Sequence, residues 1–369
     1  MKSIVAGVCV VCLIVGASWA QNSAKTKKTP VEAPWAGAVE RGAKWLASVQ
    51  GADGGWGQDG GETSYIRATE HLESNGNDVA NTAVAALALL ESGGQYQPNV
   101  DRAVDFILKK VESSPSDGLA ITGQQGTQIQ RKLGPYIDTF LTSMLLARID
   151  GTLRKPEQNA RVRKALEKCV AKIERNQKSD GSWNVAGGWA PVLGTSMASR
   201  SLYDARSKGV SVDASVVAAA ENYAKSSVSA DAIAGAGMVA TSAGSIISAD
   251  AAGVPLYQNA QALEQLTRTE ADRKKNSKEI AAISAQVSDA RFVDGFGSIG
   301  GEEFFSYLNI SDGLKRAGGE PWRKWRTDNT KKILSLQNSD GTWSGHHCIT
   351  GRVAVTAAAI LNLSIDRED

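Results

Sequence analysis

Residues Arg41–Trp56 of this 369-residue chain read RGAKWLASVQGADGGW. A Gln, a Gly four residues later and a Trp two residues after that occur here and again in Gln177–Trp183 (QKSDGSW) and Gln337–Trp343 (QNSDGTW). Asp-Gly pairs at Asp53, Asp117 and Asp180 are 64 and 63 residues apart. Recurrence at such a period indicates a fold assembled from similar successive units.

Each unit combines two kinds of helix around a Gly-rich turn. The stretch VERGAKWLASVQ is amphipathic, with Val39, Ala43 and Leu46 near one face, whereas NTAVAALALL is apolar on nearly all sides. Amphipathic helices lie at a surface and uniformly apolar ones are buried. The pattern therefore predicts an outer helix and an inner helix in every unit.

Six such pairs are predicted between residues 35 and 366, which gives an all-α fold, an α/α toroid in the form of a double-walled α6–α6 barrel. After NTAVAALALL, the further inner helices are expected at Asp138 (DTFLTSMLLARI), Thr195 (TSMASRSLYDA), Ile233–Ile247, Glu302 (EEFFSYLNISDGL) and Arg352 (RVAVTAAAILNL). A charged elaboration is expected near residues 258–290, around TRTEADRKKNSKE. Closure into a ring hides the apolar edges that an open array of repeats must cap.

The N-terminus has the pattern of an export signal. Lys2 precedes the apolar run IVAGVCVVCLIVG, and Ser18 and Ala20 are the small residues before a cleavage point. The run is shorter than a membrane-spanning helix, so residues 1–20 are predicted to be a signal peptide and residues 21–34 a flexible leader. We expect a secreted or periplasmic protein of a bacterial envelope, without a transmembrane segment after cleavage.

Charge and cysteine content argue against a nucleic-acid-binding protein and against a disulfide-stabilised scaffold. The chain has 41 basic and 39 acidic residues, a net charge of +2, so no nucleic-acid partner is expected. Cys9 and Cys12 lie in the signal, which leaves Cys169 and Cys348, whose pairing the sequence leaves open. Two cysteines do not make a disulfide framework, so a hydrophobic core must hold the chain together.

The Arg41–Trp56 stretch resembles the QW motif of squalene and oxidosqualene cyclases. The helix alternation over residues 35–365 resembles the α/α toroid of those cyclases, protein prenyltransferase β subunits, thioester domains and some polysaccharide lyases. The chain is thus similar to a divergent secreted member of that superfamily, and its relatives' unrelated chemistries leave function open. The motif residues are expected to clamp neighbouring repeats and are Gln50, Trp56, Gln177, Trp183, Gln337 and Trp343.

The catalytic motifs of the families that the chain resembles can be compared with this sequence. Squalene-type cyclases protonate their substrate with the middle Asp of DxDDTA, but this chain reads DVANTA from Asp78, with Ala80 in the middle. Thioester domains need a GCGEQ-like sequence, which neither Cys169 nor Cys348 has. We therefore expect neither cyclisation nor a thioester.

Prenyltransferases hold zinc with an Asp and a Cys from one repeat and a His from the last. Glu302 or Glu303 stands near the acidic position, and SGHHCITGR places His346, His347 and Cys348 near the histidine position. The spacing lacks the regularity of known zinc motifs. No cofactor is expected, and zinc at these residues is the lesser alternative.

One pattern recurs where the inner helices begin. Asp78, Asp138, Glu302 and Arg352 each precede a Thr or Ser by four residues, and a toroid brings these positions to one rim. The acids could simply cap helices, or they could form a pocket for acid–base chemistry or ligand binding. The expected ligand-binding set is Asp138, Glu302, Glu303, His347 and Arg352, with possible aromatic walls at Tyr65, Tyr136, Trp189 and Tyr307.

No catalytic set stands out, so whether the chain is an enzyme stays open. We expect a non-catalytic binding or scaffold protein whose central cavity or rim takes a small apolar ligand, a sugar-like ligand or a protein partner. The alternative is an exported enzyme, either lyase- or hydrolase-like with rim carboxylates or cyclase- or prenyltransferase-like with an apolar ligand.

Overall fold

The computed structural model describes residues 1, 33–61, 76–183, 190–233, 239–240, 246–247, 253–293 and 299–368. The chain divides into Met1–Pro34 and one compact unit, Trp35–Asp369. The predicted signal peptide and leader lie outside the described residues except for Met1, Ala33 and Pro34. Among the described helices, none combines the length and apolar character needed to cross a membrane.

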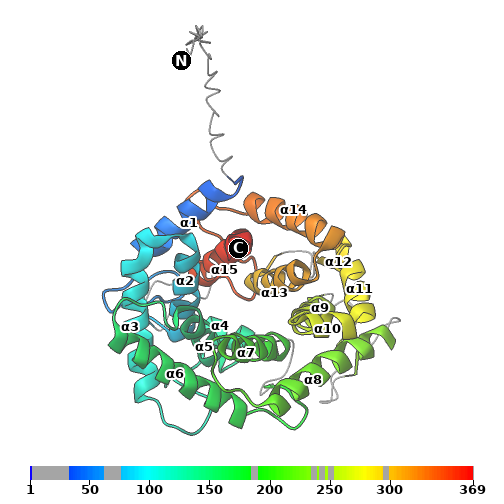
Figure 1. Cartoon of the computed structure of the whole chain (residues 1–369), viewed down its shortest axis with the longest axis horizontal. Helices are drawn as coiled ribbons and strands as arrows, with labels where there is room; N and C mark the ends of the chain where they lie inside the picture. Colours follow the sequence, from blue (N-terminus) through cyan, green and yellow to red (C-terminus); the bar gives the residue numbers. More distant parts are fainter. Residues whose placement is uncertain are drawn as a thin grey trace. The chain divides into compact units, whose positions relative to one another are not determined.

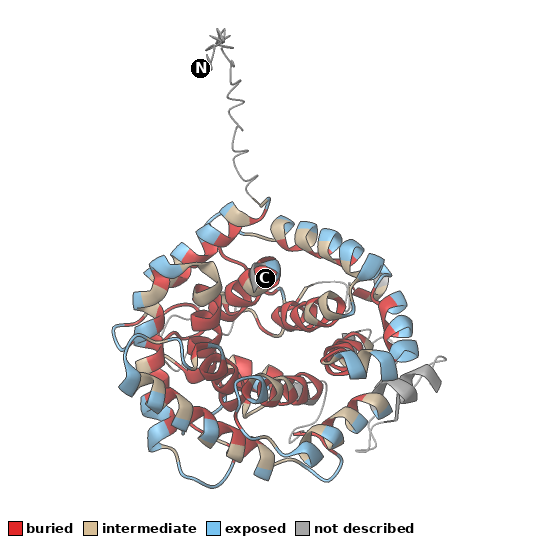
Figure 2. Ribbon diagram, in the orientation of Figure 1, coloured by how far each residue is buried: buried red, intermediate tan, exposed pale blue. Residues whose placement is uncertain are grey.

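Six helices form the inner wall of the Trp35–Asp369 unit (Figure 1). They are α2 (Val79–Ser92), α5 (Ile137–Ile149), α7 (Ala190–Ser207), α9 (Gly253–Leu266), α13 (Gly301–Ala317) and α15 (Arg352–Ser364). Each contacts the next, and α15 contacts α2, so the inner wall closes on itself. Buried residues concentrate on these helices, as Figure 2 shows.

The outer wall alternates with the inner one in sequence. Its helices are α1 (Ala36–Ser48), α3 (Gln97–Ser113), α6 (Pro156–Arg175), α8 (Ala214–Ile233), α11 (Ser277–Gln286) and α14 (Gly319–Ser335). Four short elements connect the walls: η1 (Gly94–Tyr96), α4 (Gln128–Leu133), α10 (Glu270–Lys275) and α12 (Ala290–Val293). A fifth, η2 (Ile365–Glu368), follows α15. The strands β1 (Val239–Ala240) and β2 (Ile246–Ile247) form a two-residue antiparallel pair in which Val239 faces Ile247. The predicted all-α toroid is confirmed.

The fourth unit differs from its prediction. Its inner helix is α9, Gly253–Leu266, and the expected segment Ile233–Ile247 instead holds the end of α8 and the two short strands, with the remainder outside the described residues. The charged segment after α9 contains α10 and the start of α11, so it leads into the outer wall. Much of the elaboration expected near 258–290 is therefore part of the repeat itself.

The three Gln-Gly-Trp motifs make one set of contacts. Each Trp indole N–H donates to a carbonyl ten residues earlier, from Trp56 to Leu46 at 2.8 Å and from Trp183 to Ile173 and Trp343 to Ile333 at 2.7 Å. The indole thus occupies a backbone acceptor near the end of its own outer helix, where such acceptors have no partner within the helix.

Each motif Gln reaches the next outer helix. Its amide donates to the turn Gly and to one further carbonyl, which belongs to Asn99 for Gln50, to Val216 for Gln177 and to Ala38 for Gln337. Because Ala38 lies in α1, the last of these contacts joins the end of the ring to its beginning.

The turn glycines permit this close approach. Gly181 has φ +88°, and a Cβ on it would lie 2.2 Å from the Ala219 carbonyl oxygen of α8. Gly54 is similar, with φ +91° and 2.5 Å to the Arg102 oxygen of α3. An L side chain would meet both steric exclusion and an unfavourable backbone conformation here.

Candidate functional site

Two buried aspartates share the beginning of α2, at the end of the ring where the inner helices begin, hereafter the N-terminal rim. Asp78 caps α2, since its Oδ1 accepts the Asn81 backbone N–H at 2.8 Å. Asp138, from the first turn of α5, accepts the Ala80 N–H at 3.1 Å and the Gln130 side-chain amide at 2.6 Å. Two carboxylates thus satisfy open N–H groups of one helix.

Burial is the largest cause of the raised pKa values of Asp78 and Asp138. It raises the pKa of Asp78 to about 7, with a further increase from the negative charge of Asp138. Burial also raises the pKa of Asp138 to about 6, while its hydrogen bond from Gln130 acts in the opposite direction. Both groups can therefore exchange protons near neutral pH.

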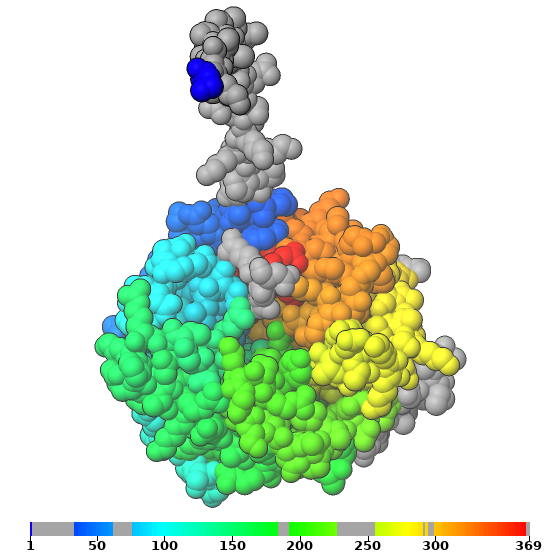
Figure 3. Space-filling model, viewed as in Figure 1, coloured from blue at the N-terminus to red at the C-terminus, as the bar shows by residue number. Residues whose placement is uncertain are grey.

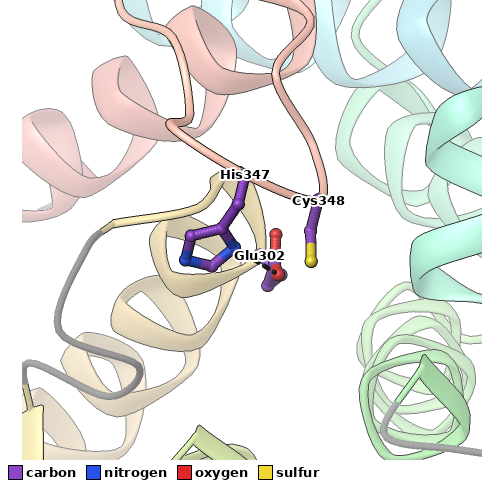
Figure 4. A group of neighbouring side chains, drawn as sticks. All are labelled: Glu302, His347 and Cys348. Carbon is purple, nitrogen blue, oxygen red and sulfur yellow. Dashed lines mark ion pairs between the residues drawn. The ribbon is translucent and has the colours of Figure 1, made fainter. Parts of the chain in front are cut away.

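A second cluster joins the start of α13 to the loop before α15 (Figure 4). Ligand atoms of Glu302, His347 and Cys348 all lie within 4.8 Å of one another. Glu302 is fully buried, its Oε2 accepts the Ile349 backbone N–H at 3.2 Å, and its Oε1 lies 3.5 Å from His347 Nδ1. No hydrogen bond to that Oε1 is found in the described part of the chain.

Glu303 extends this cluster toward α9. It is fully buried, and its Oε1 accepts the Tyr257 hydroxyl at 3.2 Å. Burial and the neighbouring Glu302 raise its pKa to about 7. Burial, followed by a hydrogen bond with Glu302, raises the pKa of the Cys348 thiol to about 12.

The loop that carries His347 and Cys348 is held close to α13. Gly301 N–H donates to Ile349 O at 2.9 Å and His346 N–H to Ile299 O at 2.8 Å. A Cβ on Gly300 would lie 2.6 Å from the His347 ring. Cys348 has φ +54°, which is uncommon for a residue with a side chain. Backbone contacts therefore fix the thiol and the imidazole beside Glu302.

The short helix α4 links the two clusters. Gln130 binds Asp138, and the Gln128 side-chain oxygen accepts the N–H groups of Thr350 and Gly351 at 3.0 and 3.1 Å. Sequence reasoning missed both glutamines and Tyr257. The capping box of Thr127 and Gln130 was a readable signal for this helix.

Two predicted members of the site lie elsewhere. Arg352 approaches Asp59 and Asp340 at 3.2 Å each, and its guanidinium lies 5.3 Å from the ring centre of Trp45. It therefore joins the last unit to the first, and its ion pairs are with these two aspartates and not with Asp138 or Glu302. His346 is exposed, and its backbone N–H donates to Ile299 O.

Of the four aromatic residues considered for a pocket wall, two are described by the structure, Tyr307 and Tyr136. Tyr307 donates to Val293 O at 3.0 Å and packs edge-on against Trp325 of α14, between the walls. Tyr136 precedes α5 and is partly exposed, while Tyr65 and Trp189 lie outside the described residues. Cys169 and Cys348 are both free thiols.

Comparison with known proteins gives matches of limited extent. The family model of the squalene-hopene cyclase C-terminal domain matches residues 12–123. A squalene–hopene cyclase of Bradyrhizobium diazoefficiens is 37% identical over 70 residues, which is 19% of this chain and 10% of that protein. The chain therefore matches only a tenth of this relative's length.

A solved structure, the type II terpene cyclase MstE from Scytonema in complex with merosterolic acid A, aligns with 89% of this chain and 95% of its own, at 12% identity and a TM-score of 0.37. The two sequence matches thus make the N-terminal part of this chain similar to squalene–hopene cyclases, and the described helices form a closed double ring.

Proposed function

We propose that this chain is an exported ligand-binding protein rather than a cyclase, and that a zinc-class ion at Glu302, His347 and Cys348 forms part of its binding site. One observation carries the proposal: Glu302 is fully buried, yet its Oε1 accepts no hydrogen bond within the described residues. A buried carboxylate oxygen without a donor is costly unless a cation or a proton compensates it.

The donor set suits such an ion. Zinc is bound by carboxylate oxygen, imidazole nitrogen and thiolate sulfur, and these three residues supply one of each. Three protein donors leave a position at which zinc can take a polar atom of a ligand. Glu303 and Tyr257 would support the site by holding the neighbouring part of α13 to α9.

The first rim cluster argues against terpenoid cyclisation. Ala80 stands where the resemblance places the proton donor, and its N–H binds Asp138. Asp78 and Asp138 are 3% and 2% exposed, and both carboxylates are engaged in capping α2. A structural role for this pair is therefore favoured over proton transfer to a hydrocarbon.

The remaining parts of the proposal rest on sequence. Residues 1–20 support export to the envelope or beyond. The ligand belongs to the classes expected from the rim, namely a small apolar molecule, a sugar-like molecule or a protein segment that provides a polar donor atom.

Metal content of the full chain, purified without chelator, tests the site. We expect about one zinc per chain by elemental analysis, and Co²⁺ exchange should produce a thiolate-to-cobalt charge-transfer band. Cys348→Ser should abolish that band, whereas Cys169→Ala, which removes the other free thiol from α6, should retain it. A chain that binds neither zinc nor cobalt would contradict the proposal.

An acid–base enzyme is the second candidate. The observation in its favour is the proximity of two carboxyl groups with pKa near 7 and 6. Turnover of an exported polysaccharide by the full chain, lost in Asp138→Asn but retained in Asp101→Asn on the outer wall, would favour it. Binding without turnover would favour the first candidate.

A further inference from the structure

A cavity of about 260 Å³ lies at the opposite end of the inner ring, where the helices end. Five inner helices line it: α2, α5, α7, α13 and α15. Figure 3 views the ring from this side, with a depression between the cyan, green and orange segments. We call this end the C-terminal mouth. Its volume lies just below the ~300–1,000 Å³ typical of small-molecule sites, so it suits a short ligand.

The lining has an apolar layer beneath a charged layer. Leu87, Met144 and Leu308 contribute to the apolar layer, and each is at most 8% exposed. Four residues further along the same helices, nearer their ends, stand Glu91, Arg148 and Asp312. Residues four apart share a helix face one turn apart, so the cavity changes from apolar to charged over one turn.

An ion pair crosses the cavity between helices that are not neighbours in the ring. Arg200 of α7 pairs with Asp312 of α13 and approaches Asn309 Oδ1 at 3.4 Å. Below it, Asn309 donates to Ser196 Oγ at 2.8 Å. Arg200 lies two turns before the end of α7, so the dipole of that helix terminus does not explain a cation here.

Cations outnumber acids in the lining. Arg148, Arg200, Lys208 and Arg316 face Glu91, Asp204 and Asp312. Glu264, just behind, is already held by Arg268 at 2.7 Å and by Arg316 at 3.4 Å. Burial raises the pKa of Asp204 to about 6, which further reduces the negative charge near neutral pH.

Donors remain at this mouth. Arg316 uses Nε toward Thr267 and Nη2 toward Glu264, and its Nη1 has no bond within the described residues. Lys208 is exposed, and no bond of its Nζ is found there either. Arginine and lysine donors of this kind bind carboxylates through charge-assisted hydrogen bonds.

We propose that the C-terminal mouth binds a short amphiphile with a carboxylate head, whose chain contacts Leu87, Met144 and Leu308 and whose head meets Arg316 and Lys208. The site is separate from the N-terminal rim and requires no metal. It predicts preference for a negative head group and dependence on an attached apolar chain.

Calorimetric titration of the full chain tests this with decanoate as the probe, and decylamine, decanol and acetate as comparisons. Decanoate should bind, and the other three should bind at least about tenfold more weakly, because each lacks the head charge or the chain. Equal binding of decylamine, or absence of decanoate binding, would overturn the proposal.

Variants locate the site. Lys208→Gln and Arg316→Gln should each weaken decanoate binding about tenfold, the loss expected for one charge-assisted bond. Leu308→Trp should reduce it by filling the apolar layer. Arg323→Gln, on the exposed face of α14, is the matched control and should leave binding unchanged. Because Lys208 is exposed, Lys208→Gln tests the site without disturbing the core. Unchanged decanoate affinity in both Lys208→Gln and Arg316→Gln would refute the proposed site.

Discussion

The two ends of the inner ring hold their buried carboxylates in opposite ways. At the N-terminal rim, burial raises the pKa of Asp78 to about 7 and that of Asp138 to about 6, and the neighbours are N–H groups and other acids. At the C-terminal mouth, burial would raise the pKa of Glu264, but Arg268 and Arg316 lower it below its usual value. Equal burial thus yields protonatable groups at one end and fixed charges at the other.

Helix direction explains much of this difference. Inner helices begin at the rim, where open N–H groups and the positive dipole end accept carboxylates without a cation. They end at the mouth, where carbonyl groups favour cations and a buried acid needs a basic partner. The rim aspartates can therefore take up protons near neutral pH, whereas the mouth depends on paired charges. Asp204 is the exception at the mouth, with its pKa raised to about 6 by burial.

Breaking the most buried ion pair should have the largest effect. Arg268 and Glu264 are 7% and 1% exposed, and their closest approach is 2.7 Å. Arg268→Met should lower the free energy of unfolding in urea by about 3 kcal/mol, because Glu264 keeps the weaker interactions with Arg316 and Arg200.

Two further variants make that result interpretable. Arg268→Met combined with Glu264→Leu should recover much of the loss, because no unpaired buried charge remains. Lys274→Met, which breaks the exposed pair with Glu270, should cause no measurable loss. A small effect of Arg268→Met that the second substitution does not change would show that this end does not depend on paired charge.

The rim should instead make stability depend on pH. The folded-state pKa of Asp138, about 6, lies above the ordinary aspartate value of 3.8, so between these values the folded chain holds more protons than the unfolded one. Stability from this group is present at low pH and decreases as pH rises from about 4 to 6. Asp138→Asn should make the decrease between pH 4 and 8 smaller by roughly 1–3 kcal/mol.

Urea unfolding at a series of pH values measures this difference. Asp78→Asn should act in the same direction, over a window that extends to about pH 7. Asp101→Asn, on the exposed side of α3, is the control and should reproduce the parent curve. If Asp138→Asn or Asp78→Asn made the decrease in stability between pH 4 and 8 larger, the raised pKa values of these aspartates would be contradicted.

Sequence periodicity predicted the ring because most inner helices are long apolar runs next to a recurrent turn. The fourth inner helix did not follow this rule. α9 buries Asn259, Gln261 and Glu264, so its sequence does not have the apolar pattern of a buried helix, and the Ala- and Ser-rich run before it fits that pattern better. Polar partners supplied by other repeats, such as Arg316, overrode the local pattern.

The functional residues were only partly readable. The repeat register indicated that Asp78, Asp138 and Glu302 would share one end of the ring. Their separation into two clusters depends on the loop before α15, which carries His347 and Cys348. Backbone hydrogen bonds and the positive φ of Cys348 determine the path of this loop. The charged layer of the mouth was present in the sequence as an acid or Arg four residues after an apolar inner residue, but only a closed ring shows that these positions converge.

The smallest effect concerns the hydroxyl groups four residues into the inner helices. Thr82 and Thr356 accept the backbone N–H of Trp56 and Trp343, both at 2.9 Å, whereas Thr142 follows a turn without Trp, and its buried hydroxyl has no partner within the described residues. Thr82→Val or Thr356→Val should cost about 1–2 kcal/mol of unfolding free energy, because a buried N–H loses its acceptor. Thr142→Val, identical in chemistry, should be neutral or stabilising, because it removes an unsatisfied hydroxyl. Equal losses of unfolding free energy at all three sites would mean that the threonines act through helix packing. The hydrogen bonds to Trp56 and Trp343 would then not distinguish their repeats from the repeat of Thr142.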